Sequence, residues 1–580
     1  MKNWLLGAVL ALAGCAGLQP PSADERVTQL MDQAWQQRLA RSPQMAAQFG
    51  DRAALAMLDD HSPAALAQAY QADLALLARA RQVDAATLSE QGQVNLAILT
   101  GILENRTDGY RFHEHLMPLT AEGGFHNEVA AIATGLTLSD TWEAEAYLAR
   151  LAALPTLFQQ QIHWMREGMR LGYTQPKVVL SGFESSIEAY LPDNADDSLY
   201  YRPFTTLPET LADTPALRAA GLKAVREQVL PAYRDYLAFF VNEYRPAART
   251  SIAAAALPEG GEYYANRVNH FITLAMTPDQ VHRLGLEEVA RIRTEMESII
   301  RALEFDGSFA DFLAYLRTDS RFYADTPEQL LRQAAWLAKQ ADAMLPRFFG
   351  KLPRTPYGVM AVPAEIAPKY TTGRYSGPGG EHQPGYYWVN TYALDKRPLY
   401  ALPALTLHEA VPGHHLQIAL TRELGEVHPL RRYHYISAFG EGWGLYAEKL
   451  GVEGDYYEDA YADFGRLSYE MWRACRLVVD TGIHAKGWSR QQAIDFMADN
   501  TALSLHNVTT EVDRYISWPG QALSYKMGEL TLWRLRHEAE QALGERFDLR
   551  GFHDTVLANG SVPLAQLERQ VRRWTARQRG

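Results

Sequence analysis

Histidine and glutamate, residue types that bind metal ions and act on metal-bound water, lie together in the stretch LTLHEAVPGHHLQIAL, residues 405–420. His408 and Glu409 begin the pattern H-E-x-x-H, in which two histidines one helical turn apart face a single metal ion. The position four residues after His408 is Pro412, which cannot bind a metal and interrupts a helix. An unbroken helix therefore cannot bring two histidines of this stretch to one ion.

The dipeptide Pro412-Gly413 offers a way around this difficulty. Proline breaks the hydrogen-bond ladder and glycine tolerates unusual backbone angles, so we expect a local loop or bulge that returns the second histidine to the metal. Either His414 or His415 is that ligand. We favour His414, because Gly413-His414 resembles the G-H pair at the second ligand of many helical zinc peptidases. The other histidine then supports the site or contacts the substrate.

A third ligand is expected in SAFGEGWGLYAEKL, residues 437–450, which resembles the second zinc motif of the gluzincin peptidases. The resemblance makes Glu441 the ligand. Glu448 lies two turns further on the same helix face, where it can hold a ligand imidazole. Two histidines and one carboxylate leave a coordination position open for water, which predicts one Zn²⁺ per chain. Glu409 suits the general base that takes a proton from that water.

Two later motifs carry further candidates for catalysis. Asp480 and His484 are an i, i+4 pair in RACRLVVDTGIHAKGW, so the acid can orient the imidazole toward substrate or an oxyanion, or both belong to a structural network. In DRYISWPGQALSYKMGEL, related peptidases suggest a tyrosine that donates a hydrogen bond to the oxyanion. Tyr525 is the first choice for this role and Tyr515 the second.

The candidate substrate-binding residues are basic or lie on an expected strand. Arg514 and Lys526 can bind a substrate carboxylate, for which arginine is suited by its bidentate geometry, and solvated charges are the alternative. In gluzincins an edge strand near the zinc pairs with extended peptide, and we expect GYYWVNTYAL to be that strand or an ordinary packed hairpin strand. The full set of substrate-binding candidates is Tyr386, Tyr387, Asn390, Arg476, Arg514, Tyr515 and Lys526.

Four motifs in order resemble the bacterial domain-of-unknown-function family 885, whose members are often lipoproteins. They are H-E-A-x-P-G-H-H at 408–415, E-G-W-x-x-Y-x-E at 441–448, R-x-x-R-L-V-V-D-T-G-I-H at 473–484 and P-G-Q-A-x-S-Y-K-x-G at 519–528. Weaker resemblance covers most of the remaining chain. The family is similar to the helical gluzincins, which implies a metallopeptidase-like fold with a cleft between two mostly helical halves.

The elements that must position these residues are mainly α-helical. Apolar residues recur at helical spacing through most of the chain, and the best strand candidates are residues 358–367 and 385–394, joined by a Gly/Pro-rich segment that is expected to be a mobile loop. We therefore predict one large helical, metallopeptidase-like domain over residues 25–580, with a small sheet beside the active-site helix. Its N-terminal half ends near residue 350, and residues 351–580 carry the zinc motifs.

The first residues predict export and lipid anchoring. Residues 1–14 read as a signal peptide too short to span a bilayer, and LAGC resembles a bacterial lipobox in which Cys15 is lipidated. Residues 15–24 are then a lipidated tether, and Ala16 favours the outer membrane, with the protein facing the periplasm or the exterior. The other cysteine, Cys475, lies in an apolar helical stretch and is expected to be buried.

Together these patterns favour a zinc-dependent peptidase acting on short peptides, whether as an exo- or an endopeptidase. Two alternatives use the same residues: a lipoprotein that binds a peptide or partner through a retained metal site, and a zinc amidase acting on a non-peptide or peptidoglycan-derived amide. The net charge of −12, from 56 basic and 68 acidic side chains, argues against a nucleic-acid partner. Nothing in the sequence indicates the oligomeric state.

Overall fold

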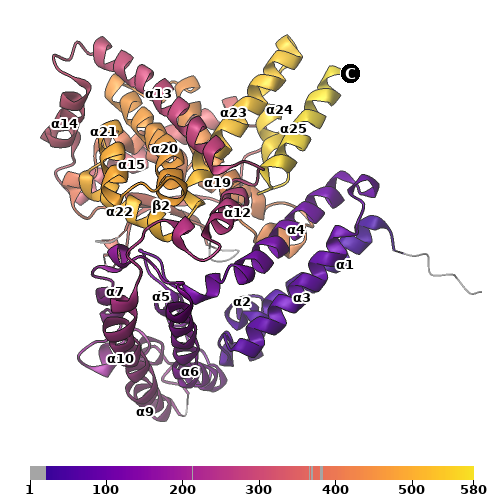
Figure 1. Ribbon diagram of the computed structural model, residues 1–580, viewed down its shortest axis with the longest axis vertical. Helices are drawn as coiled ribbons and strands as arrows, with labels where there is room; N and C mark the ends of the chain where they lie inside the picture. The colour runs from indigo at the N-terminus through magenta and orange to yellow at the C-terminus, as the bar shows by residue number, and fades with distance from the viewer. Residues whose placement is uncertain (1–20, 212, 365, 368–369, 379–382) are drawn as a thin grey trace, which may run out of the picture.

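The computed structural model describes residues 21–580 except 212, 365, 368–369 and 379–382. The fold is mainly helical, as predicted (Figure 1). The N-terminal part contains two groups of antiparallel helices that extend away from the rest (Figure 1). Its longer helices are α1 (Ala23–Arg41), α3 (Pro63–Arg81), α4 (Glu90–Arg111), α6 (Thr141–Leu171), α9 (Thr214–Ala224) and α10 (Leu230–Phe239).

The second part of the chain builds a larger helical body that carries every predicted zinc motif (Figure 1). Its longer helices are α12 (Gly260–Ile272), α13 (Pro278–Ala302), α14 (Phe309–Thr318), α15 (Pro327–Phe348), α16 (Leu402–Glu409), α17 (His414–Arg422), α19 (Ser437–Glu453), α20 (Ala460–Lys486), α21 (Arg490–Asn500), α22 (Leu505–Ser517), α23 (Ser524–Leu543), α24 (Leu549–Leu557) and α25 (Leu564–Arg579).

One small mixed sheet lies beside α16. Its strands are β1 (Tyr357–Ala361), β2 (Gly373–Ser376) and β3 (Gly385–Val389), in the order β1-β3-β2. β3 pairs in parallel with β1 and antiparallel with β2. The two predicted strands are found with shorter bounds. β2 was not expected, because it lies within the Gly/Pro-rich segment interpreted as a loop. Of the two alternatives for residues 385–394, the edge strand is wrong, since β3 is central, and the packed strand of a hairpin agrees with the antiparallel pairing of β3 with β2.

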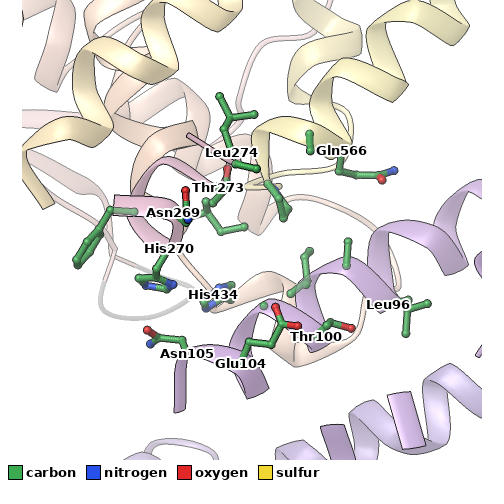
Figure 2. Close-up of a pocket in the computed structure, with 18 of the residues that line it drawn as sticks. Leu96, Thr100, Glu104, Asn105, Asn269, His270, Thr273, Leu274, His434 and Gln566 are labelled. Atoms are coloured by element: carbon green, nitrogen blue, oxygen red, sulfur yellow. The ribbon is translucent and has the colours of Figure 1, made fainter. Parts of the chain in front are cut away.

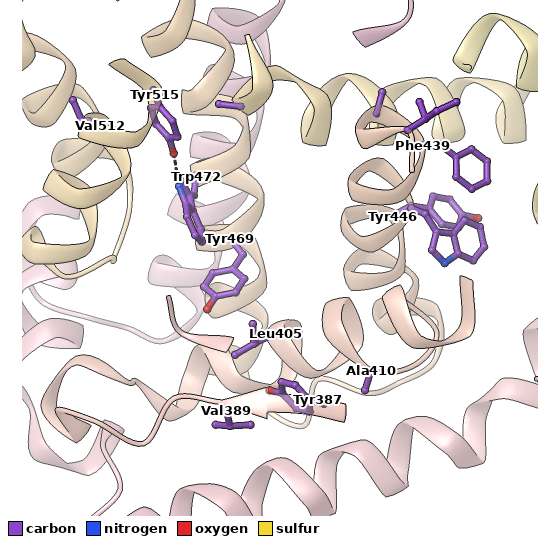
Figure 3. Close-up of a cluster of buried hydrophobic side chains, with 14 of the residues drawn as sticks. Tyr387, Val389, Leu405, Ala410, Phe439, Tyr446, Tyr469, Trp472, Val512 and Tyr515 are labelled. Atoms are coloured by element: carbon purple, nitrogen blue, oxygen red, sulfur yellow. Dashed lines mark hydrogen bonds between the residues drawn. The ribbon is translucent and has the colours of Figure 1, made fainter. Parts of the chain in front are cut away.

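The core beneath the sheet joins α16, α19, α20 and α22. Tyr387 and Val389 of β3 lie near Leu405 of α16, and Tyr515 of α22 accepts a hydrogen bond from Trp472 of α20 (Figure 3). α20 is buried over almost its whole length, including Cys475, so its polar side chains must find partners inside the protein.

Close helix packing brings α19 and α23 together. A Cβ added to Gly442 would lie 2.4 Å from the Cα of Gly528, so the two backbones touch at this point and only glycine fits. This contact places the first turn of α23 next to the first turns of α19. Glu441 and Tyr525, which are far apart in the sequence, are therefore held in one region of the fold.

The predicted signal peptide 1–14 and the lipidated Cys15 lie outside the described residues. α1 begins at Ala23, capped by Ser22 and Glu25 in a reciprocal capping box, so the end of the predicted tether is helical. Within residues 21–580, apart from the gaps given above, no helix meets the length and apolarity needed to cross a membrane.

Candidate metal centre

The helix that carries the first motif breaks where the sequence predicted. α16 ends at Glu409 and α17 begins at His414, and the backbone N–H of His415 donates to the carbonyl of Ala410 across the break. A Cβ on Gly413 would lie 1.9 Å from the carbonyl oxygen of His408, so no other residue fits there. The indole of Trp443 in α19 donates to the carbonyl of Pro412 and ties the loop to the neighbouring helix.

The break brings His408 and His414 together with Glu441. The Oε2 of Glu441 lies 3.5 Å from Nε2 of His408 and 3.3 Å from Nε2 of His414, and the two imidazole rings meet edge to face at 4.7 Å. These three residues form a group that could hold a metal ion. Tetrahedral ligands about 2.0–2.1 Å from zinc are separated by about 3.3–3.4 Å, so the two distances from Glu441 are compatible with zinc.

The outer nitrogen of His408 has a partner that fixes the ring. Its Nδ1 lies 2.7 Å from Oε1 of buried Glu448, and Arg473 of α20 approaches the same carboxylate at 3.5 Å. A proton on Nδ1, donated to Glu448, leaves the Nε2 lone pair free for a metal. A Cβ on Gly444 would lie 2.6 Å from the His408 ring, so glycine makes room for the imidazole one turn after Glu441.

The electrostatics of the group favour a bound cation. Burial lowers the pKa of His408, but hydrogen bonds with Glu441 and Glu448 outweigh it and raise that pKa to about 9. Burial raises the pKa of Glu441, but the neighbouring His414 and His408 hold it well below its usual range. The carboxylates therefore create a negative potential at the histidine nitrogens, which a proton or a metal ion neutralises.

Glu409 lies beside the group and is held by the sheet. Its Oε2 accepts a hydrogen bond of 2.7 Å from the backbone N–H of Tyr375 in β2. β2 is an edge strand, and this contact shows that its outer edge faces Glu409. The edge strand near the site is therefore β2 and not residues 385–394, for which the sequence left an edge strand and a packed hairpin strand as alternatives.

Two tyrosines approach the group. The Tyr525 ring is half-buried and lies parallel to the His408 ring at 6.5 Å, with the guanidinium of Arg476 on it at 4.1 Å. The hydroxyl of Tyr435 donates to Oε1 of Glu441 at 3.2 Å. Sequence analysis missed Tyr435, because it stands in a short connection before α19 and has no motif of its own.

His415 points away from the candidate metal centre. Its Nδ1 lies 2.9 Å from the hydroxyl of Tyr375, its Nε2 lies 3.1 Å from the carbonyl oxygen of Thr355, and Tyr357 packs on its ring. With both nitrogens engaged on this side of α17, His415 ties the helix to the sheet region, and His414 is the one that joins His408.

Asp480 and His484 do not form the expected pair. Asp480 accepts hydrogen bonds from the Tyr264 hydroxyl and the Gly520 backbone, and burial raises its pKa to about 7. His484 accepts from the N–H of Ala254 and donates to the carbonyl of Tyr515. Both side chains are fully buried in the structure, so of the two alternatives the structure favours an internal network over contact of His484 with substrate. These residues fasten α20 to its neighbours.

Tyr515 and the arginines form a second internal network. The Tyr515 hydroxyl donates to Glu511 and accepts from Arg476, which also contacts Glu511 at 2.9 Å. Arg514 is half-buried and pairs with the same carboxylate at 3.2 Å. Tyr515 and Arg476 therefore lie beneath Tyr525 and support it, whereas Arg514 lies nearer the surface.

Of the remaining substrate-binding candidates, Lys526, Asn390 and Tyr387 are buried and have polar partners, whereas Tyr386 of β3 is half-buried. The Lys526 ammonium lies 2.8–3.0 Å from three carboxylates, those of Glu529, Glu470 and Glu288, so it does not reach a substrate. The Asn390 amide donates to the carbonyls of Ala367, Tyr370 and Thr371, and the Tyr387 hydroxyl contacts the Thr406 hydroxyl. The helical and strand positions of these buried residues face the core, which the local pattern did not reveal.

The fold and this group of ligands define a mainly helical protein with a buried His/His/Glu cluster. Residues 43–571 match the family described as "Bacterial protein of unknown function (DUF885)", and the chain belongs to that family. No curated protein matches the chain.

Two solved structures have the same fold. A candidate lipoprotein from Colwellia psychrerythraea is 28% identical, with a TM-score of 0.89 over 96% of this chain and 100% of that one. A candidate lipoprotein of unknown function from Shewanella oneidensis is 18% identical, with a TM-score of 0.72 over 95% of this chain and 99% of that one.

Proposed function

We propose that this protein is a zinc-dependent peptidase, similar to the gluzincins, that hydrolyses peptide bonds of short peptides. The observation that carries the proposal is the convergence of His408, His414 and Glu441 on one point, with the carboxylate of Glu409 beside them. A group used only to bind a partner would not need a fourth, separately held carboxylate at that position.

The proposed mechanism needs metal ligands and a general base. Zinc held by His408, His414 and Glu441 would supply a Lewis acid and lower the pKa of water. Glu409 takes the proton from the attacking water and passes it to the leaving amine. The hydrogen bond from the Tyr375 N–H holds the Glu409 carboxylate in one orientation. The base is therefore positioned before the substrate binds.

Tyr525 and Tyr435 are the proposed donors to the developing oxyanion. Tyr525 has its ring fixed between Arg476 and His408, and its hydroxyl has no hydrogen-bond partner among the described residues. Tyr435 reaches Glu441 directly. A preorganised donor of this kind is worth roughly 10²–10³ in turnover.

The outer edge of β2 is the proposed docking site for the substrate backbone. It faces Glu409, and an edge strand has unpaired backbone groups with which an extended peptide can pair. This role replaces the one that the sequence assigned to the central strand β3.

The proposed location is the periplasmic or outer face of a bacterial outer membrane, reached through the lipid on Cys15. Two observations support it: the lipobox-like sequence LAGC and the candidate-lipoprotein descriptions of the two structural relatives. Replacement of Cys15 by Ser should release the protein from the membrane fraction, and unchanged membrane association would contradict the anchor.

The direct test uses residues 22–580, loaded with zinc, and a mixed peptide library read by mass spectrometry. We expect the natural sequence and the exposed control Glu426→Gln to cleave, and Glu409→Gln to bind one zinc without cleaving. The cut positions would distinguish exo- from endopeptidase action. Zinc-loaded natural protein that leaves the whole library intact would contradict the proposal.

A further inference from the structure

A large cavity separates the N-terminal helices from the elements that hold the candidate metal centre. Its volume is about 1020 Å³, which lies at the upper end of the range for small-molecule sites. One wall is α4, and the others come from the end of α12 and residues 271–275, from residues 434–437 and from residues 563–569. In Figure 2, Thr100, Glu104 and Asn105 of α4 face His270 and His434 across this space.

One face of α4 lines the cavity along several turns. Ala97, Thr100, Gly101, Glu104 and Asn105 follow one another at three- and four-residue spacing, as neighbours on one helix face do. The opposite face is buried against the first helices of the chain. A Cβ added to Gly101 meets no atom within 4 Å, so the helix surface there is not covered by any other part of the described protein.

The cavity adjoins the candidate metal centre through Tyr435. The Tyr435 ring lines the cavity and is 44% exposed, while its hydroxyl donates to the carboxylate of Glu441. Ser437, which also lines the cavity, is the first residue of α19, the helix that carries Glu441. A peptide bound in the cavity would therefore extend toward the atoms that would bind the metal.

Of the four carboxylate and guanidinium groups in the cavity wall, two form ion pairs and two are hydrogen-bonded to neutral amides. Glu104 pairs with Arg81 at 2.8 Å, Arg267 pairs with Glu114 at 3.0 Å, and Asp108 accepts a hydrogen bond from an asparagine amide. Arg569 stands at the exposed rim and donates to the neighbouring Gln566.

The two histidines of the wall add no charge near neutral pH. Burial lowers the pKa of both His270 and His434 to about 4. Apolar side chains such as Leu96, Leu274 and Ile436 complete the lining. A charged group entering the cavity would lose water against these apolar side chains, whereas an apolar group would gain contact area.

We propose that this cavity is the subsite that receives an uncharged, apolar segment of the peptide substrate on one side of the cleaved bond. The inference rests on the proposed function, and it names a preference that the metal group alone does not explain. It also assigns a role to α4, which would carry specificity although it lies outside the part of the chain that contains the zinc motifs.

Gly101→Leu tests the cavity by filling it. Leucine favours a helix more than glycine does, and the position is open, so the variant should fold. Gly261→Leu is the matched control: it is also helical with nothing within 4 Å, but it lies outside the cavity. Gly101→Ala adds one carbon and should retain both fold and preference. Thermal unfolding checks that each variant is folded.

In the hydrolysis arm, a peptide library is digested by each zinc-loaded variant. We expect Gly101→Leu to lower the cleavage of peptides with Leu or Phe next to the cut by at least tenfold and to spare those with Gly or Ala. The natural cleavage profile should persist in Gly261→Leu. An unchanged profile in a folded Gly101→Leu protein would overturn the inference.

A binding arm separates failure of this inference from failure of the proposed function. The Glu409→Gln protein is titrated into two fluorescein-labelled octapeptides, Gly-Ala-Leu-Phe-Ala-Leu-Ala-Gly and a counterpart with Asp at every Leu and Phe. Tenfold tighter binding of the apolar peptide, lost on adding Gly101→Leu, supports the cavity even where no cleavage occurs. Equal binding of the two peptides, or a preference that survives Gly101→Leu, overturns it.

Discussion

Two buried clusters of ionisable side chains in this protein differ in whether they contain their own cation. The Lys526 cluster contains its own cation: the ammonium contacts Glu470, Glu529 and Glu288 at 2.8–3.0 Å. In the candidate metal centre, the nitrogens of two histidines and an oxygen of Glu441 point at a common position instead. The first cluster is complete within the chain, and the second takes its positive charge from a proton or a metal.

Burial and charge alone do not distinguish the candidate metal centre from the Lys526 cluster. Both clusters contain perturbed groups: burial lowers the pKa of Lys526, but its carboxylate neighbours raise it above its ordinary value, and the pKa of His408 is raised in a similar way to about 9. What distinguishes the candidate site is donor atoms that converge without an internal counter-charge.

The largest expected effect distinguishes the two adjacent histidines. His414→Ala should lose stoichiometric zinc, because it removes a ligand, with a loss of affinity greater than the roughly 10- to 100-fold typical of an outer partner. His415→Ala should keep one zinc per chain and lose stability, because two hydrogen bonds disappear. Native mass spectrometry and thermal unfolding measure both. Zinc lost from a folded His415→Ala and kept by His414→Ala would reverse the assignment.

The second effect concerns the Lys526 cluster. Lys526→Met leaves the buried carboxylate of Glu529 without its cation, whereas Glu470 and Glu288 keep Arg291. The change should lower the free energy of unfolding by about 3–5 kcal/mol, with zinc stoichiometry unchanged. Lys486→Met, which breaks an exposed pair with Asp279, is the control and should cost less than about 1 kcal/mol. Denaturant unfolding gives both values. A Lys526→Met protein of full stability that fails to cleave peptides would move Lys526 into the active site.

The third effect is the pH dependence contributed by Asp480. Its pKa is raised from 3.8 to about 7 by burial, so between these values the folded protein retains a proton that the unfolded chain has released. Stability should therefore fall as the pH rises from about 4 to 7, by at most about 4 kcal/mol from this group. Asp480→Asn keeps an oxygen acceptor and should remove this part of the slope. An identical slope in the variant, measured by denaturant unfolding across this range, would contradict the assignment.

The smallest effect tests the support behind His408. Glu448→Gln keeps an acceptor for Nδ1 but removes the charge, and should weaken zinc binding by roughly 10- to 100-fold. Glu453 lies on the same helix and pairs with Arg536. The control variant Glu453→Gln should leave zinc affinity unchanged. Competition with a chromogenic chelator compares the two. Equal affinities in these variants would show that Glu448 does not support the metal.

The main features of the site could be predicted from local sequence. The spacing around Pro412-Gly413 indicated a broken helix, and the structure has that break between Glu409 and His414. Glu448 was expected two turns beyond Glu441 on one face, and it contacts His408. These inferences succeed because each depends on a few consecutive residues whose geometry is set by the helix itself.

The inferences that failed depend on distant parts of the chain. Asp480 and His484 have the spacing of a catalytic pair, but Tyr264 and Ala254, more than 200 residues earlier, supply their partners. The strand order that makes β2 an edge follows from how residues 357–389 fold back on themselves. Tyr435 reaches Glu441 only because a short connection turns at that point. Such partners become visible only once the tertiary structure is known.

The most direct measurement is anomalous diffraction at the zinc edge from crystals of the zinc-loaded chain, residues 22–580. The account predicts one strong peak about 2.0–2.2 Å from Nε2 of His408, Nε2 of His414 and a carboxylate oxygen of Glu441. A peak at other residues, or none at this position in crystals that contain stoichiometric zinc, would contradict it.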